Sequence, residues 1–120
     1  MVRISPDVGR NRVLIQLSGA LTPAEAVVGE REVREALTRL RAPVDVLSDI
    51  RELETMEALQ FADFRRIVEV LRSFGVRRVV RVVGRSAQAA VHMERLSRQF
   101  NGHTAHLAFS MEEAEQVLGK

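Results

Sequence analysis

The stretch Val44-Asp45-Val46-Leu47-Ser48-Asp49-Ile50 is the part of the sequence that decides the fold. Its apolar and β-branched residues predict a strand. Pro43 stands directly before it and stops any helix that precedes it, because proline cannot continue the helical hydrogen bonds. Helix-forming patterns lie on both sides. A strand between two helices is the repeating unit of α/β proteins, which carry largely parallel sheets.

The segment before this strand predicts a helix that begins at Pro23. Thr22 can cap the helix, Pro23 suits its first position, and Glu25 can reach back to the cap. Apolar residues then recur at intervals of three and four, at Ala26, Val33, Ala36, Leu37 and Leu40. This helix is therefore expected to pack on a core by one face.

Two strands are predicted before that helix. Val13 to Leu17 is a compact apolar run, and the turn at Asp7 to Asn11 separates it from a short strand at about Val2 to Ile4. The short turn predicts an antiparallel pair.

The C-terminal half continues the alternation of helix and strand. A second helix follows Thr55 to Glu57 and ends at Gly75. The later elements are a strand at Val79 to Val83, a third helix between Gly84-Arg85-Ser86 and Asn101-Gly102, a strand at Ala105 to Phe109, and a final helix opened by a capping box of Ser110 and Glu113.

The predicted order is therefore β-β-α-β-α-β-α-β-α. We expect an α/β fold in which a mixed, mostly parallel five-stranded sheet is flanked by four helices. Residues 1–120 form one domain, since 120 residues with 46% apolar content supply one core and no linker or repeat interrupts the chain.

Composition excludes several classes of function. The formal charge is only +2, so the basic residues give no argument for nucleic-acid binding. The absence of cysteine excludes disulfides, thiolate metal sites and cysteine nucleophiles. The first twelve residues lack the apolar run of a signal peptide, and no stretch approaches the roughly 20 apolar residues of a transmembrane helix. We expect a cytoplasmic protein without a transmembrane segment.

The sequence holds no recognisable catalytic motif. The histidines are His92, His103 and His106, and none has the spacing of a metal-binding pair. The turn Gly84-Arg85-Ser86 either holds an anion or is an ordinary tight turn followed by a serine cap. We therefore predict no catalytic residue, no metal and no cofactor.

Alternation divides each strand into two faces. One predicted face is apolar and collects Val13, Ile15, Leu17, Val44, Val46, Ile50, Val80, Val82, Ala105, Leu107 and Phe109. The other carries Gln16, Asp45, Asp49, Arg81 and His106 among apolar residues. Two explanations stay open for this polar face. Asp45 or Asp49 pairs with Arg81 across neighbouring strands, or the face forms a groove with Asp49 and Arg85 at the carboxyl end of the sheet.

The element order, the stretch from Val44 to Leu53 and the segment Leu17-Ser18-Gly19-Ala20-Leu21-Thr22 together resemble the STAS (sulphate transporter and anti-sigma-factor antagonist) family, in particular its SpoIIAA-like branch. The resemblance covers nearly the whole chain. It implies a non-enzymatic regulatory domain that binds a protein partner, such as a regulatory kinase or an anti-sigma-like protein, or a second copy of itself.

The phosphorylation loop departs from the family pattern. Phosphorylated members carry an acceptor hydroxyl at the start of the helix after the third strand, whereas the matching segment here reads Glu57-Ala58-Leu59-Gln60. Ala58 has no hydroxyl, so the usual phosphorylation switch cannot operate at this position. Glu57 is either a mimic of the phosphorylated state or a plain acidic residue in a first helical turn.

The first functional hypothesis is therefore a STAS-like interaction domain that binds its partner through Thr55, Glu57, Ala58, Arg65, Arg66 and Glu69. The alternative is a module that binds a small molecule or lipid in an apolar pocket near Phe61, Phe64 and Phe74, although a filled core explains these rings equally well. An enzyme would have to use Asp49, Arg81 or His106.

Overall fold

The computed structural model describes residues 1–55, 61–84, 91, 95 and 105–119. Its strands and helices are β1 (Val2–Asp7), β2 (Arg12–Ala20), α1 (Pro23–Leu37), β3 (Val44–Thr55), α2 (Phe61–Phe74), β4 (Val76–Val82), β5 (His106–Ala108) and α4 (Met111–Leu118). The described residues thus hold three of the four predicted helices. The predicted third helix lies outside them, apart from Val91 and Arg95.

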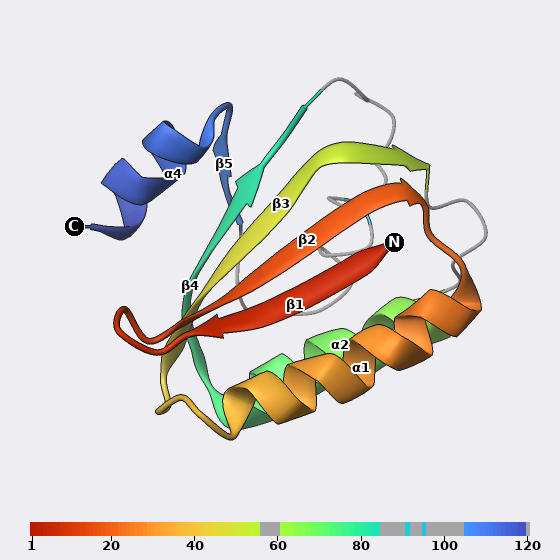
Figure 1. Ribbon diagram of the computed structural model, residues 1–120, viewed down its shortest axis with the longest axis horizontal. Coiled ribbons are helices and arrows are strands. Elements are labelled where there is room, and N and C mark those ends of the chain that lie inside the picture. Colours follow the sequence, from red (N-terminus) through yellow and green to blue (C-terminus); the bar gives the residue numbers. More distant parts are fainter. Residues whose placement is uncertain (56–60, 85–90, 92–94, 96–104, 120) are drawn as a thin grey trace.

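The five strands form one sheet in the order β1-β2-β3-β4-β5 (Figure 1). β1 pairs antiparallel with β2, and the other three neighbouring pairs are parallel. The predicted α/β class and the mostly parallel five-stranded sheet are therefore confirmed. Both β1 and β5 are edge strands.

Helices cover the sheet on both faces. In Figure 1, α1 and α2 lie side by side along one face, and α4 lies by β4 and β5. The core between the sheet and the helices α1 and α2 contains Val13, Ile15, Val33, Ala36, Leu37, Leu40, Val44 and Val46. A second core, between the sheet and α4, contains Leu47, Val80, Val82, Ala108, Ala114 and Leu118.

This second core corrects the predicted division of β4 into faces. Cross-strand partners share a face, and β3 pairs with β4 so that Leu47 is opposite Val80 and Ser48 is opposite Arg81. Val80 therefore points to α4, together with Val82, while Arg81 points to the face of α1 and α2. Valines occur at both alternating positions of β4, so the sequence pattern does not distinguish its faces.

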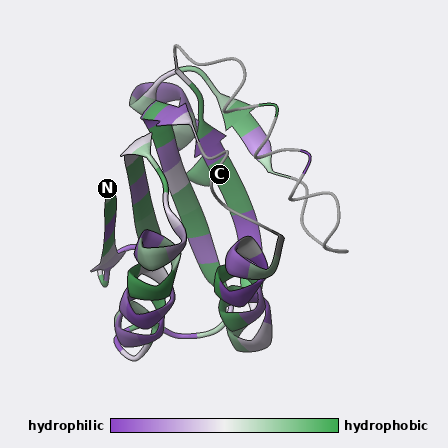
Figure 2. Cartoon of the chain, turned by 90° about the vertical axis from the view of Figure 1, so that its right-hand side faces the viewer, coloured by the Kyte–Doolittle hydropathy of each residue, from purple (hydrophilic) through white to green (hydrophobic). Residues whose placement is uncertain are grey.

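The predicted division of β5 into faces holds, because Leu107 is opposite Arg81 on the face of α1 and α2 and His106 is opposite Val80 on the face of α4. The predicted burial is wrong. Ala108 is fully buried beside α4, whereas Leu107 and Phe109 are exposed. Hydropathy along the elements is drawn in Figure 2.

The predicted helix caps hold with one change. Thr22 Oγ1 accepts a hydrogen bond from the Glu25 backbone N–H (3.3 Å), as predicted for α1. In α4, Ser110 Oγ accepts from Glu113 N–H (3.0 Å), as in a capping box. The Glu113 carboxylate, however, accepts from the backbone N–H of Phe109 (3.2 Å), the residue before the cap, and not from that of Ser110. None of the helices in the described part of the chain is long and apolar enough to cross a membrane.

Candidate functional site

The predicted partner-binding residues divide between the end of β3 and the outer face of α2. Thr55 is the last residue of β3, and its carbonyl accepts a hydrogen bond from Leu21 N–H (2.9 Å) just after β2 ends. Glu57 and Ala58 lie outside the described residues. The structure therefore places Thr55 at the carboxyl end of the sheet, where open α/β sheets bind ligands.

The outer face of α2 carries charge. Arg65 Nε donates to Glu69 Oε1 (2.7 Å), and both side chains are more than half exposed. Arg66 is also exposed and forms no ion pair with any described residue. The opposite side of α2 packs on the core through Ile67, Val70, Leu71 and Phe74. α2 thus presents to solvent one ion pair and, in Arg66 and Arg72, two arginines that are not paired with any described residue.

Asp49 lies towards the carboxyl end of the sheet, as predicted, but its partner is Arg51. The buried Asp49 carboxylate accepts hydrogen bonds from Arg51 Nε (2.9 Å), Arg51 Nη2 (2.9 Å) and the Arg51 backbone N–H (3.1 Å). Burial by itself raises the pKa of Asp49, but the hydrogen bonds from Arg51 and Gln16 outweigh it, so the pKa lies below its usual value. Asp49 is therefore a charged anchor for Arg51 and is poorly suited to act as a general acid near neutral pH.

Asp45 is the centre of a second ionic cluster, at the amino end of β3. Its carboxylate, which is 3% exposed, accepts hydrogen bonds from Arg77 (3.1 and 2.7 Å) and from Arg78 (3.3 and 3.0 Å). Burial raises the pKa of Asp45, but the hydrogen bonds and positive charges of the two arginines lower it by more. The pKa of Asp45 therefore lies below its usual value.

This cluster attaches α4 to the sheet. Arg78 also donates to the backbone carbonyls of Val117 (3.1 Å) and Leu118 (2.8 Å) at the C-terminal end of α4. Nearby on α4, Glu115 accepts from the buried Arg12 of β2 (2.6 Å). Asp45 and Asp49, the two carboxylates predicted on the second sheet face, are therefore explained by ionic contacts within the protein.

The predicted pairing of Asp45 or Asp49 with Arg81 is wrong. Arg81 is buried on the other face of the sheet, where it is opposite Ser48. Arg85 lies outside the described residues, as do His92 and His103, and His106 is exposed on β5. Asp49, Arg81 and His106, the residues named for an enzyme, therefore do not form one site, since Arg81 points away from Asp49.

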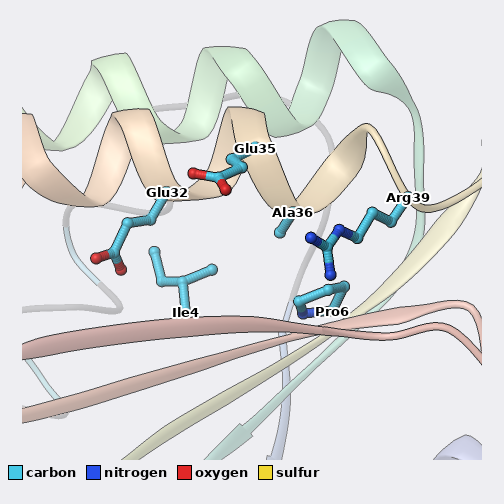
Figure 3. Close-up of a pocket in the computed structure, with 6 residues that line it drawn as sticks. All are labelled: Ile4, Pro6, Glu32, Glu35, Ala36 and Arg39. Carbon is cyan, nitrogen blue, oxygen red and sulfur yellow. The ribbon is translucent and has the colours of Figure 1, made fainter.

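An open pocket of about 240 Å³ lies between β1 and α1 (Figure 3). It is lined by Ile4, Pro6, Glu32, Glu35, Ala36 and Arg39. A carrier of lipids or small molecules needs roughly 300 Å³ or more of mainly apolar space, whereas three of these six side chains are charged. Phe74, one of the three rings named for the carrier hypothesis, packs in the core beside α1.

The lowered pKa values of Asp45 and Asp49 predict acid sensitivity. Carboxyls whose pKa is lower in the folded protein stabilise it above the unfolded pKa of about 3.9, and this stability is lost as pH falls through the folded pKa. We expect the free energy of unfolding to fall below about pH 4. Urea unfolding at a series of pH values measures this, and a stability that stays constant down to about pH 2 would contradict it.

Comparison with known proteins finds similar structures but no similar sequence among protein-family models or curated proteins. No protein-family model matches the chain, and no curated protein matches its sequence. Structures of similar fold are known. The anti-sigma factor antagonist SpoIIAA in its unphosphorylated form is 17% identical, with a TM-score of 0.64 over 100% of both chains.

Two further structures agree. An uncharacterized protein of the DUF3478 family from Shewanella loihica PV-4, which has a SpoIIAA-like fold, is 16% identical with a TM-score of 0.67 over 98% of this chain and 92% of that one. The Bacillus cell fate determinant SpoIIAA in its phosphorylated form is 15% identical, with a TM-score of 0.54 over 98% and 99% of the two chains. The resemblance noted in the sequence is thus confirmed in three dimensions, and this chain has the SpoIIAA-like fold.

Proposed function

We propose that this chain is a non-enzymatic regulatory domain that binds a partner protein through the outer face of α2 and the adjoining end of β3. The observation that carries the proposal is the likeness to SpoIIAA along the whole chain. SpoIIAA is an anti-sigma factor antagonist, so the proposal assigns to this chain a function of the same kind, performed by contact with another protein.

The charges of α2 indicate which partner surface would fit. Arg66 is exposed with no ion pair among the described residues, and Arg65 shares only the exposed Glu69. Exposed ion pairs contribute little to stability, so little free energy is lost when these side chains turn towards another molecule. Arginine is also enriched at protein interfaces because its guanidinium binds carboxylates with two hydrogen bonds. The proposed partner therefore presents acidic side chains to α2.

The regulation of this contact is proposed to differ from that of the phosphorylated relatives. SpoIIAA is known in phosphorylated and unphosphorylated forms. In this chain the matching position is Ala58, which has no hydroxyl to accept a phosphate. We therefore propose that partner binding here is controlled without phosphorylation at residue 58.

Reversing the two arginine charges of α2 is expected to abolish partner capture. The experiment purifies the tagged chain from its source organism and quantifies bound proteins by mass spectrometry, for the wild type and for Arg65→Glu/Arg66→Glu. Like charges placed opposite each other at an interface oppose binding strongly. We expect one partner to be retained by the wild type and reduced about tenfold or more in the variant, which corresponds to about 1.4 kcal/mol.

The matched control reverses two exposed arginines on α1, in the variant Arg31→Glu/Arg34→Glu. It changes the net charge by the same amount on a neighbouring helix, so it should retain the partner. Equal capture by all three proteins would place the contact elsewhere. Recovery of the chain bound only to copies of itself would replace the regulatory partner with a homo-oligomer.

A further inference from the structure

The outer edge of β1 is an unpaired strand edge. The Met1 carbonyl accepts a hydrogen bond from Ser18 N–H (3.0 Å), so the backbone groups of Met1 and of alternate residues after it point to β2. The backbone groups of Val2 and Ile4 therefore point away from the sheet. No backbone or side chain among the described residues bonds to them on that side.

Pro6 limits how far a strand can pair along this edge. Its nitrogen carries no hydrogen and would otherwise point outwards like those of Val2 and Ile4. The edge thus offers two adjacent pairing positions, which suits a short extended segment better than a long strand.

The pocket between β1 and α1 lies on the face of the sheet to which Ile4 points. In Figure 3, Ile4 and Pro6 form its strand side, while Glu32, Glu35 and Ala36 come from α1 and Arg39 from the turn that follows it. Glu32 is drawn at the Ile4 end and Arg39 at the Pro6 end. A strand added to β1 would direct the side chain opposite Ile4 into this pocket, because cross-strand partners share a face.

The two carboxylates of the pocket share it with Arg39 but form no ion pair with it. Neither Glu32 nor Glu35 forms an ion pair or a side-chain hydrogen bond with any described residue, unlike two other glutamates of α1. Those two are paired, Glu25 with the N-terminal ammonium group (2.7 Å) and Glu30 with Arg34 (3.7 Å). Two unpaired carboxylates one helical turn apart, beside an open strand edge, are complementary to a basic side chain.

We propose that this edge is a second interaction site, which binds an extended basic segment of another protein by β-strand addition. The segment forms backbone hydrogen bonds with Val2 and Ile4, and a lysine or arginine opposite Ile4 reaches Glu32 and Glu35. Arg39 repels a second basic residue opposite Pro6, so it sets the register of the segment. This site is distinct from the α2 surface.

A second copy of the chain fits this edge poorly. Two β1 edges joined by a two-fold axis would extend one sheet and keep both α1 helices on the same face. Glu32 and Glu35 of one copy would then approach Glu32 and Glu35 of the other. This like-charge contact opposes self-association through β1 and favours a basic partner.

The test titrates the protein with a capped peptide that alternates threonine and lysine, and with a matched peptide that alternates threonine and glutamate. Amide NMR spectra report where each one binds. We expect the lysine peptide to shift the amide resonances of Val2 and Ile4 and to slow their hydrogen exchange. The variant Glu32→Lys/Glu35→Lys should bind the lysine peptide about tenfold more weakly or worse and should prefer the glutamate peptide.

The control Glu52→Lys/Glu112→Lys makes the same change in net charge at exposed glutamates away from the pocket, and it should leave lysine-peptide binding nearly unchanged. The proposal is overturned if the lysine peptide does not bind, if both double variants weaken it equally, or if its shifts fall on other elements. Concentration-dependent protection of Val2 and Ile4 without any peptide would assign the edge to a second copy instead.

Discussion

Gly84→Ala is expected to destabilise the protein by about 3 kcal/mol, because the added methyl group would overlap the backbone of β3. A Cβ atom at Gly84 would lie 2.6 Å from Arg51 Cα and 2.9 Å from Arg51 C, and it would also overlap the Arg51 carbonyl oxygen. Real Cβ contacts are essentially never shorter than 3.0 Å. Backbone atoms cannot rotate away as a side chain can, so β3 and the chain after β4 would have to separate.

Chemical denaturation measures this loss, and Gly9→Ala is the matched control. A Cβ at Gly9 would meet only Asp7 Oδ1 within 4 Å, at 3.8 Å. Gly9 lies in the turn between β1 and β2, where alanine would restrict the unfolded chain, so its effect is expected to lie within about 1 kcal/mol of zero. Equal stability of the two variants would show that the carboxyl ends of β3 and β4 can move apart freely.

The structure gives a reason for Gly84 that the sequence motif alone did not indicate. In the sequence, Gly84-Arg85-Ser86 was compatible with an anion site or with a tight turn. The close approach of Arg51 gives Gly84 a packing reason that requires no ligand. That approach depends on the path of β3, which is distant in sequence, so local chemistry could not predict it.

The parts of the fold that local signals determine were predicted well. Thr22 and Pro23 begin α1 where expected, and the turn before Arg12 produces the antiparallel pair. β1 extends further than predicted, to Asp7, and includes Pro6. An edge strand tolerates proline where the missing N–H faces solvent, so the breaker signal that ended the predicted strand did not apply.

The candidate ionic contacts were predicted less well, because they depend on register. Asp45 and Asp49 were correctly identified as unusual strand residues, but Arg81 was named as their partner. β4 begins at Val76, three residues earlier than predicted, so Arg78 is opposite Asp45. A pattern with valines at both alternating positions does not show which arginine faces the aspartates.

Asp45→Asn is expected to destabilise the protein by about 2–3 kcal/mol at neutral pH. Asparagine keeps the shape of the side chain but removes the charge that Arg77 and Arg78 share. Removing one partner of a buried ion pair usually costs about 3–5 kcal/mol. We expect less here because the side chains of Arg77 and Arg78 are 58% and 29% exposed, so water can solvate part of their charge.

The loss should extend to α4, since Arg78 also bonds the carbonyls of Val117 and Leu118. Asp45→Asn should therefore speed amide exchange in α4 more than in α1, which has no direct contact with this cluster. The control Asp7→Asn removes an exposed pair with Arg10 (3.5 Å) and should cost under about 0.5 kcal/mol. A stability loss by Asp45→Asn no larger than that of the control would mean that apolar packing alone holds α4 on the sheet. If the loss is large at neutral pH and shrinks below about pH 4, the charge of Asp45 is what joins β3, β4 and α4, because protonation then removes the same charge from the wild type.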